Sequence, residues 1–213
     1  MDILITGANR GIGAALLRDY RAEGRDAAGT ARSAGDLLSL DVTDPASVAA
    51  LAASLGGAPL GLLVCNAGVY LDKGHTLGHG YGADLWAQTF ATNVTGVFLT
   101  IEALLPNLRA AKGKIAIISS QMASQTNATG GAYIYRASKA AALNLGRNLA
   151  VDLKGEGIAV GIHHPGWVQT DMGGATAAIT PDEASKGLRA RFAALTLATS
   201  GCFETWDGRA HPF

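Results

Sequence analysis

The sequence predicts an α/β fold in which a doubly wound parallel sheet is covered by helices on both faces. Short apolar runs alternate with longer helix-like segments along the whole chain. Some runs are apolar almost throughout, as in Leu-Gly-Leu-Leu-Val-Cys at 60–65, which is typical of strands buried on both faces. A glycine turn between the first run and the first helix fits the same architecture. The chain has 213 residues and no linker, repeat or low-complexity tract, so we expect one domain over 1–213.

The expected elements follow one another in a regular order. The apolar runs predict strands at 3–5, 26–32, 37–40, 60–65, 114–119, 158–163 and 202–205. The longer segments between them predict helices at 12–23, 45–55, 83–109, 133–154 and 181–198. This alternation is typical of βαβ units, which give parallel neighbouring strands. The glycine-rich segment 74–82 follows a strand and is the part expected to be most loop-like.

Composition narrows the function before any motif is considered. The chain carries 17 basic and 17 acidic residues and is 48% hydrophobic, so no global charge attracts nucleic acid or an anionic membrane. No uninterrupted apolar run approaches the ~18 residues of a membrane span, and the chain enters a strand and a glycine turn at once. We therefore expect a cytoplasmic protein. Cys65 and Cys202 are too few for a disulfide framework and are expected to be reduced thiols.

A tyrosine and a lysine four residues apart form the first candidate for chemistry. Tyr135 and Lys139 occur in Tyr-Arg-Ala-Ser-Lys within an expected helix, so both project from one face. A tyrosine hydroxyl titrates near pH ~10, and a neighbouring ammonium brings that pKa toward working pH. The spacing alone also suits any amphipathic helix with one core residue and one solvated residue. Tyr133 is a second phenol, but Ala137 stands where its lysine would be.

The glycine turn is the second candidate. Thr-Gly-Ala-Asn-Arg-Gly-Ile-Gly spans 6–13, between the first strand and the first helix, where glycines bring backbone N–H groups close to a diphosphate. The spacing differs from G-x-G-x-x-G. A glycine turn can also simply connect a strand to a helix without binding anything.

Together these motifs resemble the classical short-chain dehydrogenase/reductase family, whose cofactor turn is T-G-x-x-x-G-x-G. Other segments agree in order, namely Leu-Asp-Val-Thr-Asp, Asn-Ala-Gly at 66–68, Asn-Val-Thr-Gly, Ser-Ser at 119–120, the Tyr135–Lys139 pair, and Pro-Gly with Thr170. The resemblance spans nearly the whole chain. Tyr-Arg-Ala-Ser-Lys-Ala-Ala-Leu-Asn, His-Pro-Gly-Trp-Val and the closing Trp-Asp-Gly are similar to the small carbonyl-reductase-like branch that includes sniffer and the bacterial C-factor proteins. The resemblance implies a single-domain Rossmann-type sheet with strand order 3-2-1-4-5-6-7.

The resemblance also implies catalytic roles. Tyr135 would exchange a proton with the substrate oxygen, and Lys139 would lower the phenol pKa and hold the ribose hydroxyls of the cofactor. Ser120 would hydrogen-bond the substrate oxygen, and Asn93 would hold a water that links Lys139 to solvent. Either serine, Ser119 or Ser120, could face the substrate, and we choose Ser120 because it is nearer the carboxyl end of its strand. Read alone, Asn93 could instead be a capping or kinking residue and Ser120 a strand-end cap.

The residues at the end of the second expected strand favour NADP(H) over NAD(H). An NAD enzyme usually has an acid there, whereas a 2′-phosphate prefers arginine. Here Ala31 and Arg32 occupy the region, and Arg10 in the glycine turn can supply a second cation. Arg32 could also be only a solvated surface charge. By resemblance the cofactor-binding set is Gly7, Asn9, Arg10, Gly11, Ile12, Gly13, Arg32, Asp41, Val42, Asn66, Ala67, Gly68, Tyr135, Lys139, Pro165, Gly166, Val168 and Thr170, with Asp41 and the backbone after it meeting the adenine ring.

The substrate is expected at the carboxyl edge of the sheet, where the loops after Gly68, Ser120 and Gly166 meet. The candidate pocket residues are Val69, Tyr70, Gln121, Met122, Trp167 and Met172. Most are apolar, which favours a carbonyl attached to a hydrophobic or aromatic body, although Trp167 could instead be core. Little chain separates Thr170 from Thr180, so an open pocket is expected. The i, i+4 pair His75 and His79 lies in a glycine-rich context that does not suit a metal site.

The sequence therefore predicts an NADP(H)-dependent oxidoreductase that reduces an aldehyde, ketone or quinone to the alcohol. Two alternatives stay open: an NADP-dependent alcohol dehydrogenase working mainly in oxidation, and a nucleotide-binding signalling protein of the C-factor kind with little turnover. The expected partner is a small molecule, with neither nucleic acid nor membrane. The resemblance allows a homo-oligomer formed through the helices that begin near Gly96 and Tyr133.

Overall fold

The computed structural model, which describes residues 1–33 and 35–213, contains one parallel sheet of seven strands. The strands are β1 (Ile3–Ile5), β2 (Ala27–Ala31), β3 (Leu38–Ser39), β4 (Leu62–Cys65), β5 (Lys114–Ile118), β6 (Ala159–His164) and β7 (Phe203–Thr205). Their order in the sheet is β3-β2-β1-β4-β5-β6-β7, which confirms the predicted topology. The order reverses direction between β1 and β4, so the carboxyl ends of these two strands open a crevice.

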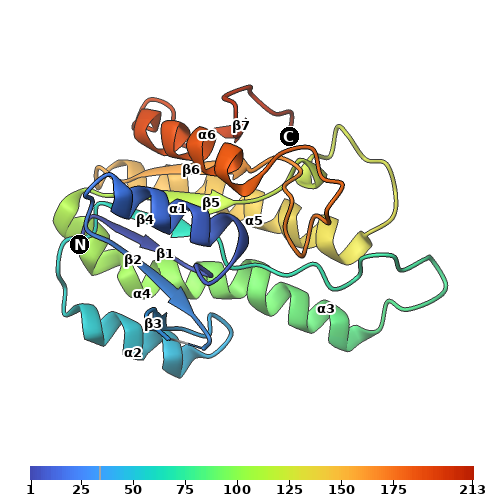
Figure 1. The fold of residues 1–213 in the computed structure, drawn as a ribbon, viewed down its shortest axis with the longest axis horizontal. Helices are drawn as coiled ribbons and strands as arrows, with labels where there is room; N and C mark the ends of the chain where they lie inside the picture. Colours follow the sequence, from blue (N-terminus) through green and yellow to red (C-terminus); the bar gives the residue numbers. More distant parts are fainter. Residues whose placement is uncertain (34) are drawn as a thin grey trace.

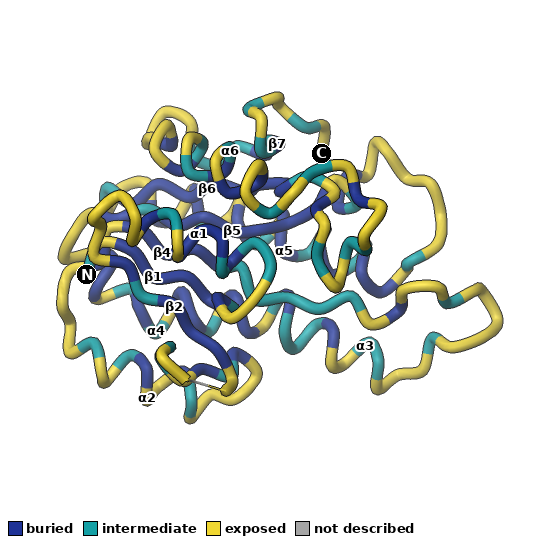
Figure 2. The backbone as a smooth tube through the Cα atoms, viewed as in Figure 1, coloured by how far each residue is buried: buried dark blue, intermediate teal, exposed yellow. Residues whose placement is uncertain are grey.

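Helices cover both faces of this sheet (Figure 1). They are α1 (Gly11–Ala22), α2 (Pro45–Leu55), α3 (Ala83–Phe90), α4 (Gly96–Ala111), α5 (Tyr133–Lys154) and α6 (Pro181–Ala194), with a π-helical turn, η1 (Ala91–Thr95), and a short 3-10 turn, η2 (Gln121–Ala123). Helices α1 and α6 pack on one face and α2, α4 and α5 on the other. The sheet between them is the most buried part of the chain (Figure 2).

Alternating side chains along the strands explain the two cores. In β1, Leu4 contributes to the core under α2, α4 and α5, whereas Ile3 and Ile5 contribute to the core under α1 and α6. The same alternation runs through β4 and β5. Strands that are apolar on both faces therefore fold as the sequence predicted.

The helix expected at 83–109 departs from a plain α-helix. Its described form runs from Ala83 to Ala111 and contains the π turn η1, which places Asn93 where α3 joins α4. By length and mean hydropathy (1.2) this run could cross a membrane. Val97, Ile101 and Leu104 of α4 are instead part of the core against the sheet, so the run is apolar because it packs on the sheet.

The last helix is shorter than expected. It was predicted to reach residue 198, but α6 ends at Ala194 because Leu195 adopts an extended backbone. The start of α6 is well defined by a capping box, in which Thr180 and Glu183 bond each other's backbone N–H groups. The polar segment after Leu195 forms a turn held by Thr196 and Thr199 and leads into β7.

Candidate active site

Two adjoining cavities lie at the carboxyl edge of the sheet. The larger cavity has a volume of about 940 Å³ and runs from the end of β2 across the glycine turn to Tyr135 and Lys139. The smaller cavity, of about 390 Å³, lies between the loops that follow β4, β5 and β6. Both are lined by Tyr135 and Met172, so the phenol stands where the two cavities meet.

The glycine turn has a geometry that few other residues could adopt. Gly7 has φ +67°, and a Cβ added to it would lie 2.9 Å from the Cα of Ala67. A Cβ on Gly13 would collide with the carbonyl oxygen of Gly7 and the side-chain amide of Asn66. Gly7 lines the larger cavity and Gly13 does not. Gly13 therefore lets the first turn of α1 pack closely against the glycine turn. Gly7 and Gly11 instead expose their backbone to the cavity.

Side-chain hydrogen bonds fix this turn to the loop after β4. The Thr6 hydroxyl accepts from the backbone N–H groups of Asn66 and Ala67, each at 3.0 Å. The Asn66 side chain donates to the carbonyls of Thr6 and Gly7, also at 3.0 Å. The two motifs, far apart in sequence, thus form one rigid floor for the larger cavity.

The end of the larger cavity beside β2 is lined by the residues expected to contact the adenosine part of the cofactor. Exposed Arg32 follows β2 and lines the cavity with Asp41 and Val42. The Asp41 carboxylate accepts from the backbone and hydroxyl of Thr43, and these hydrogen bonds hold the pKa of Asp41 below its ordinary value. Arg10 is engaged differently from what the sequence suggested, because its guanidinium donates to Asp171 at 2.8 Å. That ion pair joins the glycine turn to the loop after β6, and Arg32 is the more available cation.

Tyr135 and Lys139 lie on one face of α5, as the spacing predicted, and both are buried. Burial raises the pKa of Tyr135 to about 12, and an interaction with the Ser120 side chain opposes this rise. Burial lowers the pKa of Lys139 to about 8. The Lys139 ammonium donates to the Ile118 carbonyl at 2.9 Å and lies 5.7 Å from the Tyr135 ring centre. Burial is thus the main influence on the pKa of Tyr135 in this structure, and the lowering of that pKa by Lys139 stays a prediction.

The two serines after β5 have different surroundings. The Ser119 hydroxyl donates to the Lys139 backbone carbonyl at 3.0 Å, which ties α5 to the end of β5. Ser120 lines the smaller cavity, and its hydroxyl accepts from the Met122 N–H at 3.1 Å at the start of η2. Ser120 is also the serine that acts on the Tyr135 pKa. These contacts favour Ser120 as the residue that faces a substrate.

Asn93 sits in the π turn and lines neither cavity. Its amide donates to the Val69 carbonyl (2.9 Å) and the Ser138 hydroxyl (3.0 Å), and its oxygen accepts from the Val69 N–H (2.8 Å). Ser138 in turn donates to the Tyr135 carbonyl at 2.8 Å. A Cβ on Gly68 would be 3.3 Å from the Asn93 oxygen and 3.5 Å from the Lys139 ammonium, so both groups lie beside the same glycine. The π turn therefore lets the Asn93 amide join the loop after β4 to α5, close to Lys139.

Asp72 is a site residue that the sequence reasoning missed. Its carboxylate is fully buried and accepts from the backbone N–H groups of Ile134 (2.9 Å) and Tyr135 (3.2 Å). The preceding Ala132 offers no side-chain cap to α5. Asp72 thus caps the helix from the loop after β4 and holds the backbone of Tyr135. The sequence signal was the alanine at the cap position, which means that the helix needs its cap from elsewhere in the chain.

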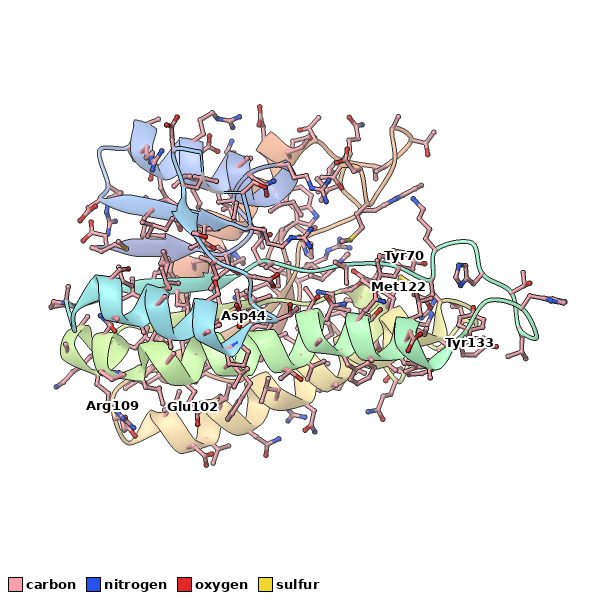
Figure 3. All side chains as sticks on the ribbon, turned by 90° about the horizontal axis from the view of Figure 1, so that it is seen from below. Asp44, Tyr70, Glu102, Arg109, Met122 and Tyr133 are labelled. Atoms are coloured by element: carbon pink, nitrogen blue, oxygen red, sulfur yellow. The ribbon has the colours of Figure 1, made fainter. Side chains whose placement is uncertain are left out.

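The smaller cavity has aromatic and thioether walls. The rings of Tyr70 and Tyr135 stack with centres 4.2 Å apart, and the Met172 sulfur lies 4.0 Å from the Tyr135 hydroxyl. Tyr70 and Met122, labelled in Figure 3, both line this cavity. Trp167 is 52% exposed and donates to the Gly173 carbonyl, so it forms part of the cavity wall and is not core.

Most of the expected site residues line one of these cavities, with a few exchanges. Gly166 and Val168, expected at the cofactor, line the smaller cavity, and Val69, expected at the substrate, lines the larger one. The expected cofactor residues that line the larger cavity are Gly7, Asn9, Arg10, Gly11, Ile12, Arg32, Asp41, Val42, Asn66, Ala67, Gly68, Tyr135, Lys139, Pro165 and Thr170. The expected substrate residues that line the smaller one are Tyr70, Gln121, Met122, Trp167 and Met172.

Comparison with known proteins agrees with this arrangement. The family model described as short chain dehydrogenase matches residues 2–179. The 1-hydroxy-2-glutathionyl-2-methyl-3-butene dehydrogenase of Rhodococcus sp. (strain AD45) is 36% identical over 97% of the chain and 96% of its own length. The C-signal protein of Myxococcus xanthus is 37% identical over 77% of the chain and 99% of its own length.

Solved structures give the same picture for the fold. The NADPH-bound carbonyl reductase from chicken fatty liver superposes with a TM-score of 0.92 at 30% identity, covering 100% of this chain and 98% of that one. The carbonyl reductase Sniffer of D. melanogaster superposes with a TM-score of 0.93 at 26% identity, covering 100% and 99%. These likenesses confirm the resemblance drawn from the motifs.

Proposed function

The chain belongs to the short-chain dehydrogenase/reductase family, and we propose that it is an NADPH-dependent carbonyl reductase. Its substrate is an aldehyde, ketone or quinone with a hydrophobic or aromatic body, which it reduces to the alcohol. The observation that carries this proposal is the position of Tyr135, whose phenol stands between a cavity that fits a dinucleotide and a smaller apolar cavity beside Ser120. Residues 1–213 act as one NADP(H)-binding domain, whose substrate pocket is built from loops at the carboxyl edge of the sheet.

NADP(H) is the cofactor that fits the larger cavity. Gly7 and Gly11 of the glycine turn line this cavity and can bring backbone close to a diphosphate, and Arg32 supplies a cation at the end of β2. Lys139 would hold the nicotinamide ribose, and Thr170 and Pro165 would flank it. When bound, the cofactor supplies a hydride to the substrate carbonyl carbon.

The chain's own residues supply the proton and hold the oxygen. Tyr135 is protonated at neutral pH because burial raises its pKa to about 12, so it is ready to donate to a carbonyl oxygen. Ser120 donates a second hydrogen bond to that oxygen, which fixes its position. Lys139 is mostly charged at pH 7, since its pKa is about 8, and its ammonium favours the phenolate that remains after transfer. We assign to Asn93 the water that links Lys139 to solvent.

The walls of the smaller cavity support an apolar substrate body. Tyr70, Met122 and Trp167 offer aromatic and thioether contacts that suit rings and alkyl groups. Half-exposed Trp167 and exposed Met172 leave the cavity accessible, which favours broad over narrow specificity. We place the protein in the cytoplasm as an enzyme of small molecules.

Two other functions follow from particular relatives. The Rhodococcus relative is named as a dehydrogenase, which favours an NADP-dependent alcohol oxidation at the same site. The Myxococcus relative is named as a signal protein, which favours a nucleotide-binding role with little turnover. The intact set of Ser120, Tyr135 and Lys139 favours catalysis over binding alone, because a binder needs neither the serine hydroxyl nor the phenol.

A panel assay tests the proposal. Aldehydes, ketones and quinones are mixed with NADPH and the purified protein, and NADPH absorbance is followed over time. We expect turnover of at least one aromatic carbonyl and little with NADH. Alcohols with NADP⁺ are run alongside, and turnover in that direction alone would favour the dehydrogenase. Tight NADPH binding without turnover of any compound would contradict the reductase and favour the signalling role.

A further inference from the structure

A histidine in the smaller cavity has no part in the proposed chemistry. His164 is the last residue of β6, directly before the Pro-Gly turn, and it is 7% exposed. It lines the cavity together with Ser120 and Met122. The end of β6 thus brings His164 to the same cavity as Ser120.

The imidazole of His164 has unused hydrogen-bonding capacity. Its Nδ1 is buried without a hydrogen-bond partner among the described residues, whereas Nε2 is not fully buried and forms no hydrogen bond there, so Nε2 is the nitrogen available to a substrate. Burial, with smaller contributions from His211 and Arg209 and against an opposing one from Asp207, lowers the pKa of His164 to about 4. The ring is therefore neutral at pH 7 and carries one donor and one acceptor nitrogen. The nearest titratable ring, His211, lies edge to face with centres 6.1 Å apart.

Packing alone does not explain why a histidine occupies position 164. A buried polar atom without a partner costs stability, which an apolar side chain of similar size would avoid. The neighbouring His163 provides a comparison, because it too is buried with unpaired nitrogens but packs against Phe192, with ring centres 5.1 Å apart, and lines neither cavity. Of the two histidines, only His164 is placed to meet a substrate.

We propose that His164 binds the substrate by hydrogen-bonding a second, neutral oxygen group, a hydroxyl or a further carbonyl, on the body of the carbonyl compound. The apolar walls of the cavity bind the hydrophobic part of that compound, and Ser120 with Tyr135 holds the reacting oxygen. The imidazole would then distinguish carbonyl compounds that carry a second oxygen group from those whose body is only hydrocarbon. This inference rests on the proposed reductase function.

Matched substrates and matched variants test it. Hydroxybenzaldehydes are compared with methylbenzaldehydes carrying the substituent at ring position 2, 3 or 4, because hydroxyl and methyl groups are similar in size. The measured quantity is the ratio of kcat/KM for each hydroxyl–methyl pair. The enzymes are the wild type, His164→Leu and His164→Met as two independent apolar replacements, His164→Gln as a replacement that retains donor and acceptor, and His163→Leu as the control. Melting temperature and NADPH binding are measured for each.

We expect the wild type to prefer the hydroxyl compound at one ring position by about tenfold, mainly through KM. The preference should disappear in His164→Leu and His164→Met, return in part in His164→Gln, and persist in His163→Leu. The melting temperature of the apolar variants should equal or exceed that of the wild type.

The possible failures are distinguishable. If the wild type reduces both members of every pair equally well, or if the preference survives in the apolar variants, the role of His164 is wrong while the reductase function stands. If no compound of the broad panel is reduced, the proposed function itself fails and this inference fails with it.

Discussion

The Tyr135 side chain is buried and lines both cavities, so the loss of its hydroxyl should affect turnover more than cofactor binding. Tyr135→Phe keeps the ring that stacks on Tyr70 and removes only the hydroxyl. We expect NADPH affinity to survive and turnover to fall by ~10²-fold or more, since the proton donor is lost. Steady-state kinetics and fluorescence titration with NADPH measure the two effects. Turnover near the wild-type rate would mean that another group donates the proton.

Lys139 should make cofactor binding depend on pH. Its pKa in this structure is about 8, so the ammonium is present below that pH and is lost as the pH rises through it. The charged form is the one that donates to ribose hydroxyls, so NADPH affinity should be nearly constant below about pH 7, weaken as the pH rises through about 8, and be low by about pH 9.5. Titration in Lys139→Met gives the control, where the slope should vanish and affinity should be low throughout. A flat wild-type profile would contradict the ribose role.

The two arginines of the larger cavity should differ in their effect on cofactor choice. Arg10 is paired with Asp171, whereas Arg32 forms no ion pair among the described residues. We expect NADPH to bind more tightly than NADH by about 1–3 kcal/mol through a charge-assisted contact to the 2′-phosphate. Arg32→Ser should remove most of that difference and Arg10→Ser less of it, as measured by calorimetry with both nucleotides. Equal affinities in the wild type would remove the basis for an NADP enzyme.

Single residues also show what the sequence could and could not reveal. The positions of Tyr135, Lys139 and Gly7 follow from spacing and backbone chemistry, and the structure places them as expected. Asp72 was missed because it acts through backbone N–H groups that are distant in sequence, and the sequence alone does not show that its carboxylate is buried. Ser138 was missed because its contact with Asn93 joins side chains that are distant in sequence. The rise that burial gives the pKa of Tyr135 was also hidden, since burial cannot be read from spacing.

At the scale of elements, α5 depends on a cap supplied by another part of the chain. Asp72 accepts from two N–H groups at the first turn of α5, and no side chain at Ala132 replaces it. Asp72→Ala should therefore reduce the free energy of unfolding by about 1–3 kcal/mol and slow turnover, because the Tyr135 backbone loses its anchor.

Urea unfolding and steady-state kinetics measure both consequences of removing the cap. Asp72→Asn is the matched variant, since it keeps an acceptor oxygen but loses the charge that favours a helix N-terminus, and it should lie between wild type and alanine. Asp44→Ala is the control, because Asp44 caps α2, lines neither cavity and should affect stability without changing the turnover of folded protein. A fully stable and fully active Asp72→Ala would contradict the capping role.

The elements themselves were largely predictable from periodicity, and their irregularities were not. The seven strands and their order follow from apolar runs that alternate with helix-length segments. The π turn at Ala91–Thr95 has no composition signal, because it is stabilised by the contacts of Asn93 with Val69 and Ser138. The early end of α6 at Ala194 depends on local bonds of Thr196 and Thr199 that compete with helix.

At the scale of the whole molecule, topology alone brings the site together. The carboxyl ends of β4, β5 and β6 deliver Gly68, Ser120 and His164 to one edge, and α5 crosses that edge with Tyr135. This convergence was predictable because parallel strands share the direction of their ends. The division into two cavities was harder to predict, because it depends on the positions that Val69, Gly166 and Val168 take in their loops.

The position of Trp167 leads to a prediction that distinguishes a catalytic pocket from a merely structural one. The indole is 52% exposed and lines the smaller cavity, so Trp167→Ala removes contact area without touching the proton donor. We expect KM to rise more for bulky aromatic carbonyls than for small aldehydes, with the free energy of unfolding changed by less than about 1 kcal/mol. A tryptophan that supported the core would instead cost about 3–5 kcal/mol, and activity toward every substrate would decline together.

Trp86→Ala gives the matched control for Trp167→Ala, because Trp86 packs against Phe90 within α3, with ring centres 5.8 Å apart, and lines neither cavity. Its substitution should leave the ratio of the two KM values unchanged. Kinetics with a large and a small aldehyde, run beside urea unfolding, decides between the cases. An unchanged KM ratio in stable Trp167→Ala protein would mean that the substrate body does not rest on this wall, and the apolar specificity proposed for the smaller cavity would then be wrong.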